Sequence, residues 1–393
     1  MGIYLDNAAT TRCDKEVAAA VEKALLEAYG NPSSMHRMGF EAEQQVKQAV
    51  HDLSTTLKVQ PEEIVFTSGG TESDNMALFG VARACARLGK HILTTPIEHA
   101  AVARTAEALK EEGFEIELLP VDGLGRVDPE AVRASVRPDT ILVSVMAVNN
   151  EIGTVQDLAA IAKAAKEKNP AILFHTDAVQ GYGKIPLDVR KAGIDLLAAS
   201  GHKFHGPKGT GFLYIKKGTR IRPLIYGGGQ QKGQRSGTDN VPGILGMTLA
   251  AVKANRALES FGREVSGLRD DFIGMVKERV ENVTVNGPAG STDPDIRAFA
   301  APHIVSLSVP GVRAEVLLHA LEDKEIYVSA GSACSSHAAG KLPGTATLRA
   351  IGLDAASLPS TIRISLSRET TKEELTETAQ ALEALVPALR RYT

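Results

Sequence analysis

The stretch LLAASGHKFHGPKGTGFLYI, residues 196–215, carries the clearest signal of fold in this chain. One apolar run ends at Ser200, and a second resumes at Gly211 after a turn rich in glycine and proline. Near-continuous apolar runs predict strands buried on both faces of a sheet. Lys203 lies between the two runs, although lysine belongs naturally on the surface. A partly desolvated lysine has a lowered pKa and can form a Schiff base, while a solvated loop lysine is an equal alternative here.

Similar apolar runs alternate with alanine-rich segments of helical periodicity between residues 60 and 220. Such alternation predicts a mostly parallel sheet with helices on both faces. The sequence therefore predicts an α/β fold. Besides the two runs above, the predicted strands are EEIVFTS (62–68), HILTTP (91–96), EIELLP (115–120), TILVSVMAV (140–148) and AILFHTDAV (171–179).

The pattern changes after about residue 255. A long helical stretch over residues 254–281 precedes short apolar runs, a second helix over 314–323 and a last helix from about Lys372. Thr371 and Glu374 form a capping-box pattern at the start of that last helix. We expect a large domain over residues 14–255, and a smaller α+β domain formed by residues 1–13 and 256–393.

Composition and charge exclude several classes of protein. The 393 residues include 44 basic and 47 acidic side chains, a net charge of -3, which does not suit a nucleic-acid-binding surface. No apolar run approaches the roughly 20 residues that span a membrane, and the first residues lack a secretory pattern. The three cysteines are far apart and form no C-x-x-C pair, so neither a metal site nor a disulfide framework is expected. We expect a cytoplasmic enzyme with no nucleic-acid or membrane partner.

Asp177 follows directly after the apolar run ILFHT, and Gln180 comes three residues later. In open α/β sheets, functional groups gather at the carboxyl ends of strands. An aspartate there can bind a metal, orient a histidine or hold a protonated ring nitrogen. Taken alone, a turn or helix-cap aspartate is the more common explanation.

The stretch FTSGGTESDN, residues 66–75, predicts a strand followed by a helix. Glycines at such a turn expose backbone N–H groups, and the helix dipole favours an anion there. Alternatively, Thr71 and Asp74 form an ordinary capping box. A Schiff-base lysine, an aspartate for a ring nitrogen and a helix N-terminus for a phosphate are together the protein groups that pyridoxal phosphate requires.

The chain also resembles, over essentially its whole length, the cysteine desulfurases of the NifS/IscS type, within the class V aminotransferase superfamily. This resemblance implies the pyridoxal-phosphate-dependent transferase fold of type I. Ten motifs in order carry it: YLDNAAT (4–10), GNPSSMH (30–36), FTSGGTESDN (66–75), IEHAAV (97–102), VNNEIGT (148–154), HTDAVQ (175–180), SGHKFHGPKG (200–209), RSGTDN (235–240), GSACSS (331–336) and IRISLS (362–367).

The resemblance implies a site for pyridoxal 5′-phosphate. Lys203 would form the Schiff base, and His99 would stack on the cofactor ring and help to move protons. Asp177 would pair with the pyridine nitrogen, and Gln180 and Asn150 would contact the ring hydroxyl. The residues expected to hold the phosphate are Gly70, Thr71, Ser200, His202 and, from the neighbouring subunit of a homodimer, Thr238.

The resemblance also implies a reaction, the conversion of L-cysteine to L-alanine. Arg363 would bind the substrate carboxylate, a task suited to its fork of donors, and Asn31 would assist. Cys334 would take the sulfur as a persulfide and pass it to an acceptor, such as an iron–sulfur scaffold or a carrier for thio-cofactor synthesis. The small residues around Cys334 argue against a buried, inert cysteine and predict a mobile segment.

Other functions remain open at this point. A selenocysteine lyase or another class V enzyme would share the cofactor residues, but a transaminase has no use for Cys334. A non-catalytic sulfur-transfer scaffold is at odds with the intact set of Lys203, Asp177 and His99. The stretch HAAGKLPGTAT, residues 337–347, departs from the common family pattern and is longer. A change there suits a desulfurase that serves one particular acceptor.

Overall fold

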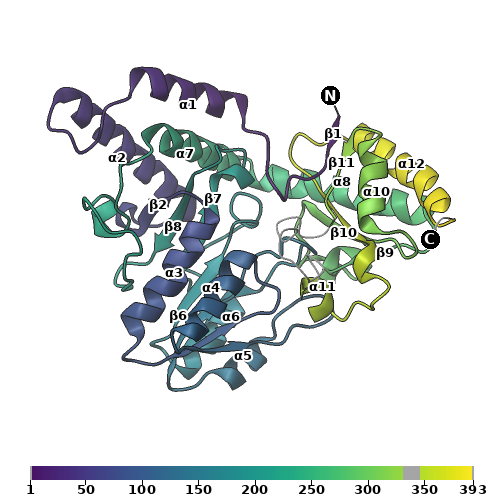
Figure 1. The fold of residues 1–393 in the computed structure, drawn as a ribbon, viewed down its shortest axis with the longest axis horizontal. Helices are drawn as coiled ribbons and strands as arrows, with labels where there is room; N and C mark the ends of the chain where they lie inside the picture. Colours follow the sequence, from purple (N-terminus) through teal and green to yellow (C-terminus); the bar gives the residue numbers. More distant parts are fainter. Residues whose placement is uncertain (1, 331–345, 392–393) are drawn as a thin grey trace.

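The computed structural model describes residues 2–330 and 346–391 (Figure 1). Cys334 and residues 337–345 of the divergent stretch lie outside the described residues. Within the described part of the chain, no helix is long and apolar enough to cross a membrane.

Seven strands form the principal sheet of the described chain, in the order β2-β8-β7-β6-β5-β3-β4. All neighbours from β7 to β4 pair in parallel, whereas β8 runs antiparallel to both β2 and β7. Each strand falls in one of the predicted apolar runs, so the mostly parallel α/β sheet is confirmed. The strands are β2 (Ile64–Thr67), β3 (His91–Thr94), β4 (Glu115–Leu118), β5 (Thr140–Ser144), β6 (Leu173–Asp177), β7 (Leu196–Ser200) and β8 (Gly211–Ile215).

Helices cover both faces of this sheet because its strands are apolar on both sides. Phe212 and Tyr214 of β8 pack into one hydrophobic cluster, while Leu213 between them packs into another on the opposite face. The first cluster includes side chains of α2 (Arg37–Leu57), α5 (Pro129–Ser135), α6 (Leu158–Lys168) and α7 (Val241–Arg256), and α1 (Lys15–Glu27) packs against α7. The second cluster includes α3 (Gly70–Cys85) and α4 (Ala100–Glu111).

A separate hydrophobic cluster lies toward the other end of the molecule, at the right of Figure 1. It joins a sheet of order β12-β10-β9 to helices α8, α10 and α12. The capping box predicted for the last helix is confirmed, since both of its hydrogen bonds form. The elements are α8 (Leu258–Arg279), β9 (Thr284–Asn286), α9 (Pro294–Arg297), β10 (Ile304–Ser308), α10 (Ala314–Glu322), α11 (Ala346–Ala350), β12 (Thr361–Ser365) and α12 (Lys372–Leu389). The domain boundaries stay a prediction.

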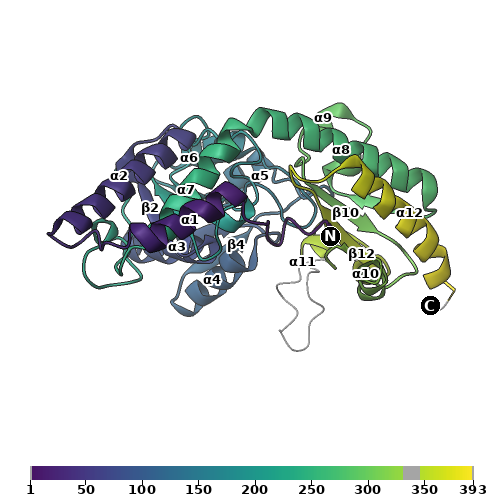
Figure 2. The ribbon, with the colours of Figure 1, turned by 90° about the horizontal axis from the view of Figure 1, so that it is seen from above.

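The long helix expected over residues 254–281 is α8, which begins later than expected, at Leu258. The helical run breaks at Ala257, between α7 and α8, and each helix serves a different hydrophobic cluster. Figure 2 shows the two helices following one another along the molecule.

The N-terminal segment connects the two clusters. Strand β1 (Ile3–Tyr4) pairs in parallel with β11 (Ile326–Tyr327), and the chain then continues to α1 (Figure 1). We call residues 5–11 the N-terminal strap. Its Asp6 forms an isolated bridge with Ser365, and the Thr11 N–H donates to the carbonyl of His202 at 2.9 Å. The strap therefore contacts the smaller sheet at β12 and, near the larger sheet, the turn that follows β7.

Candidate active site

The site is built at the carboxyl ends of β6 and β7, two neighbouring parallel strands. Asp177 is the last residue of β6, and Ser200 is the last residue of β7. A short 3₁₀ turn, η2 (Gly201–Lys203), follows β7 directly and carries Lys203. Because parallel strands end at the same edge of a sheet, residues far apart in sequence meet here.

Lys203 contacts the N-terminal strap. Its Nζ donates hydrogen bonds to the carbonyl of Ala8 at 2.7 Å and to that of Ala9 at 2.8 Å. The side chain is only partly exposed, so these main-chain carbonyls orient an amino group that has lost some of its water.

Asp177 presents a buried carboxyl at the same edge. Its Oδ1 accepts the N–H of Val179 at 2.8 Å. Burial raises the pKa of Asp177, and its nearby basic neighbours, the side chains of His99 and Lys203, act in the opposite direction. A cationic N–H placed against this carboxylate would therefore be favourable.

Helix α3 begins at the same edge without a side-chain cap. Its N-cap residue is Gly69, so the capping box considered for Thr71 and Asp74 is wrong. Thr71 is instead the second residue of α3 and is exposed. A Cβ added to Gly70 would lie 2.5 Å from Cγ2 of Val179, so only glycine lets the helix start so close to the turn after β6. The first N–H groups of α3 can thus serve an anion.

Two histidines near this edge are held by defined partners. His99 is the N-cap of α4, and its Nδ1 accepts the N–H of Ala101 at 3.1 Å, so the neutral ring carries its proton on Nε2. His202 Nδ1 lies 3.0 Å from the hydroxyl of Thr10. Burial and the neighbouring Lys203 lower the pKa of His202 to about 4, so this ring is neutral at neutral pH.

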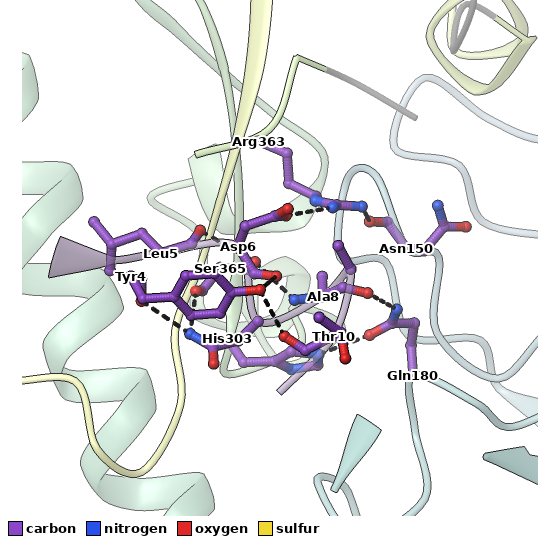
Figure 3. Close-up of polar contacts among 12 residues, drawn as sticks. Tyr4, Leu5, Asp6, Ala8, Thr10, Asn150, Gln180, His303, Arg363 and Ser365 are labelled. Carbon is purple, nitrogen blue, oxygen red and sulfur yellow. Dashed lines mark hydrogen bonds and ion pairs between the residues drawn. The ribbon is translucent and has the colours of Figure 1, made fainter. Parts of the chain in front are cut away.

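Arg363 lies on β12 and extends toward the same region, as Figure 3 shows. Its Nη2 donates to Oδ1 of Asp6 at 2.8 Å, and its Nη1 donates to the carbonyl of Asn150 at 2.8 Å. Its Nε is buried and has no partner among the described residues. Asn150 thus contacts Arg363 through its main chain. Gln180 donates from Nε2 to the carbonyl of Ala8 at 2.8 Å.

Two of the predicted site residues lie elsewhere in the single chain. Asn31 is exposed in the connection between α1 and α2, at the end of the molecule remote from β12 (Figures 1 and 2). Thr238 is exposed in the segment before α7. Cys334 is outside the described residues. Among the described residues, the single chain therefore brings Lys203, Asp177 and Arg363 to one region, but neither Asn31 nor Thr238.

Sequence reasoning missed the buried acids behind this edge. Glu98 precedes His99, and its Oε1 accepts from the N–H of Met146 at 3.0 Å and from the Thr95 hydroxyl at 2.8 Å. Burial raises the pKa of Glu98 to about 8. Asp74 is buried on α3, and neither carboxyl oxygen accepts a hydrogen bond from the described residues. Its match to a capping-box pattern concealed it in the sequence.

The strap residues were also missed as parts of the site. Asp6 and Ala8 belong to the quoted motif YLDNAAT, but no role for either one follows from the sequence. The carboxylate of Asp6 and the carbonyl of Ala8 reach Arg363, Gln180 and Lys203 only because the strap pairs with distant strands.

Comparison with known proteins agrees with this architecture. The pattern of the aminotransferase class-V family matches residues 3–377. Cysteine desulfurase IscS of Dictyoglomus turgidum is 44% identical over 99% of this chain and 95% of its own length. A solved NifS-like protein is 38% identical, covers 99% of this chain and 100% of its own, and superposes with a TM-score of 0.91. A solved SspA in complex with cysteine is 32% identical over 93% and 98% of the two chains, with a TM-score of 0.78.

These likenesses confirm the pyridoxal-phosphate-dependent transferase fold of type I. The matched region includes both sheets and the strap, so the likeness is not restricted to one part of the chain. The chain belongs to the aminotransferase class-V family, among the cysteine desulfurases of the IscS type.

Proposed function

We propose that the protein is a pyridoxal 5′-phosphate-dependent cysteine desulfurase, which converts L-cysteine to L-alanine and carries the sulfur as a persulfide on Cys334. Class-V aminotransferases and cysteine desulfurases are pyridoxal phosphate enzymes. The observation that supports the proposal best is the meeting of Lys203, Asp177 and the uncapped start of α3 at one edge of the sheet.

The residues at this edge fit the cofactor. The buried carboxyl of Asp177 suits a protonated ring nitrogen, and the start of α3 at Gly70 suits a phosphate, with Thr71, Ser200 and His202 nearby in the chain. The amino group of Lys203 suits the cofactor aldehyde. When bound, pyridoxal phosphate supplies an electrophilic carbon and a ring that accepts electrons from the substrate.

The protein's own groups supply binding and proton transfer. Arg363 would bind the cysteine carboxylate through its guanidinium, whose orientation is fixed by Asp6 and the Asn150 carbonyl. Lys203 Nζ would take up the proton from Cα of the substrate. His99, whose Nε2 carries the proton in its neutral ring, would donate from that atom.

Cys334 would then act as a thiolate on the substrate sulfur. The bond between sulfur and Cβ breaks, and a sulfur–sulfur bond forms on Cys334. Both sulfurs are oxidised and Cβ is reduced, and Cβ receives the proton that the thiols release. One cysteine and one thiol thus give one alanine and one persulfide, so no external oxidant or reductant is needed.

Replacement of the proposed nucleophile tests this function. We expect Cys334→Ala to abolish alanine formation from L-cysteine, while the visible absorbance of the bound cofactor stays unchanged. Cys85→Ala is the matched control, because Cys85 is a free cysteine on α3 that faces the hydrophobic cluster. Full alanine formation by Cys334→Ala would refute the persulfide mechanism.

The active form is proposed to be a homodimer in which Thr238 reaches the cofactor phosphate of the other subunit. Exposed apolar side chains around the connection between α1 and α2 support this assembly, because such patches mark protein interfaces. They lie in the same segment as Asn31, and this segment is remote from β12, the strand that carries Arg363 in the same chain. The side chains are Leu25, Leu26, Tyr29, Met35 and Phe40. A fully active monomer in sedimentation analysis would contradict the dimer.

The sulfur acceptor is proposed to be another protein, such as an iron–sulfur scaffold. Cys13 and Cys85 are free thiols, which suits a reducing compartment such as the cytoplasm. The proposed division of the chain is a large cofactor-binding domain over residues 14–255 and a small domain from residues 1–13 and 256–393. The two separate hydrophobic clusters, one joined by α7 and the other by α8, support this division.

A further inference from the structure

Two buried basic side chains beside the site have no part in the mechanism above. Lys184 is 6% exposed, and its Nζ lies 3.3 Å from Oε1 of Gln180. His303 is completely buried just before β10, and its Nε2 lies 3.4 Å from the same oxygen. Figure 3 shows His303 and Gln180 beside the strap. Both basic groups therefore converge on one end of one carboxamide.

The three contacts of Gln180 fix which way its amide points. Lys184 donates to Oε1, Nε2 donates to the carbonyl of Ala8 at 2.8 Å, and Nε2 of His303 lies 3.4 Å from Oε1. Rotation of the amide by 180° would set its NH₂ group against two donors and its oxygen against a carbonyl. That orientation would lose the bonds with Lys184 and Ala8. It would keep the contact with His303 only if the ring proton moved to Nδ1, which is buried and has no partner among the described residues.

These contacts use only one of the two N–H bonds of the Gln180 amide. The Nε2 group has two hydrogens, and Ala8 accepts one of them. The second hydrogen is available to a further acceptor. Under the proposed function, that acceptor is the ring oxygen of the cofactor.

The chemistry of His303 agrees with a donor role. Burial lowers the pKa of His303 well below its usual value, with Lys184 and Arg363 adding to the effect, so the ring is neutral. A neutral ring can donate to Gln180 only if the proton is on Nε2. Its Nδ1 has no partner among the described residues, which agrees with this tautomer.

The burial of the Lys184 side chain is energetically unfavourable, which suggests that this side chain has a function. Burial lowers its pKa well below the usual value, and Lys203 and Arg363 add to that effect. No ion pair of Lys184 occurs within the described residues, although a buried lysine normally has one. A cavity of about 30 Å³ lies beside Lys184 and Lys203, which is room for a water molecule.

We propose that Lys184 and His303 are positioning residues that hold the Gln180 carboxamide with its N–H toward the ring oxygen of pyridoxal phosphate. The proposal rests on the proposed function. It joins three segments, since Lys184 follows β6, His303 precedes β10 and Ala8 belongs to the strap. Gln180 contacts the cofactor, and the other two residues act through it.

Matched substitutions separate this role from simple packing. His303→Leu removes the donor, whereas His303→Gln places an amide N–H near the position of Nε2. Lys184→Met keeps the length of the side chain without its charge or donor. Each protein is reconstituted with pyridoxal phosphate, and the dissociation constant and the visible absorbance maximum are measured. We expect about tenfold weaker binding and a shifted maximum for His303→Leu and Lys184→Met, the effect of one lost hydrogen bond, and near-normal values for His303→Gln.

The same substitutions in a Gln180→Leu background complete the test as a double-mutant cycle. If the two residues act through Gln180, adding His303→Leu or Lys184→Met there changes cofactor affinity less than about twofold. Wild-type values for both single variants, or full additivity with Gln180→Leu, would overturn the proposal. If His303→Leu does not fold by circular dichroism, Lys184→Met decides the question. A wild-type protein that forms no Lys203-dependent absorbance band would instead refute the proposed function.

Discussion

The edge of the large sheet and the N-terminal strap contribute to the site in different ways. The edge supplies reactive side chains, such as Asp177 and Lys203, each fixed by the end of a buried strand. The strap supplies mostly main-chain carbonyls, from Ala8 and Ala9, and one carboxylate, from Asp6. Under the proposed function, reactivity therefore comes from the edge, and alignment comes from the strap.

The two regions also differ in how firmly they are held. Strands β6 and β7 pair on both sides within the sheet and are almost completely buried. Within the described residues, the strap lacks a neighbouring strand on each side. It is held by the two-residue pairing of β1 with β11, by the bridge of Asp6 with Ser365 and by single hydrogen bonds, such as that from the Thr11 N–H to the His202 carbonyl at 2.9 Å. Changes at the edge should thus remove the chemistry, and changes in the strap should weaken it by degrees.

Lys203 is where the two regions meet, so its loss should have the largest effect. We expect Lys203→Ala to lower alanine formation by about 10⁴-fold or more, because the covalent holder of the cofactor and the proton acceptor are both lost. The visible absorbance band of the cofactor should also be lost. Lys208→Ala is the control, an exposed lysine in the same loop. Retained activity in Lys203→Ala would show that this edge of the sheet takes no part in the reaction.

Asp177→Asn tests the edge without disturbing its shape. Asparagine can still accept the N–H of Val179, but it has no negative charge for a ring nitrogen. We expect kcat to fall about 100- to 1000-fold with a small change in KM. Steady-state kinetics with L-cysteine measure both. A change in KM alone would mean that Asp177 aligns the substrate, which is the role proposed for the strap. The edge and the strap would then not differ in function.

Asp6→Asn tests the strap. The substitution weakens a charge-assisted hydrogen bond to Arg363, so the guanidinium is held less firmly for the substrate carboxylate. We expect KM for L-cysteine to rise about tenfold while kcat changes little. Tyr4→Phe is the control for a loosened strap of unchanged charge, because it removes only the bond to Thr10 and the weaker one to Asp6. A fall in kcat like that of Asp177→Asn would show that strap and edge are not separable.

Glu98→Gln should have the smallest effect, on stability rather than activity. Burial raises the pKa of Glu98 from 4.5 to about 8, so the folded protein keeps a proton that the unfolded chain releases. Wild-type stability should therefore decrease as pH rises from about 4.5 to 8, by at most about 1.4 kcal/mol per pH unit. The Glu98→Gln variant has no proton to release at this position and cannot show this loss.

Urea unfolding at about pH 5 and about pH 7.5 measures this loss of stability, because the two pH values span most of the range. The stability of Glu98→Gln relative to wild type should increase toward the higher pH. Glu62→Gln, at a position outside the buried site, is the control and should follow wild type. Equal pH dependence in Glu98→Gln and wild type would show that no proton is held behind the edge.

The same contrast explains what the sequence could predict. Asp177 and Lys203 were predictable because each follows an apolar strand, and strand ends meet at one edge. Asp6 and Ala8 were not predictable. A carbonyl has no sequence signature, and the partners of the strap are far away in the sequence, more than 150 residues for Gln180 and Lys203 and more than 300 for Arg363 and Ser365. The capping box at Thr71 was wrong because the helix already begins at Gly70. Asn31 and Thr238 are exposed away from the site of their own chain, so their predicted roles depend on the proposed homodimer.

The pairing of the strap with β12 has a consequence for folding during synthesis on the ribosome. The strap is made first, but its partner Ser365 emerges near the end of synthesis, long after β8 completes the large sheet. At usual rates of translation the interval between β8 and Ser365 is roughly 8 to 30 seconds. During that time the nascent chain has a finished sheet edge but no partner on β12 for its strap. The complete cofactor site is thus one of the last parts of the molecule to form.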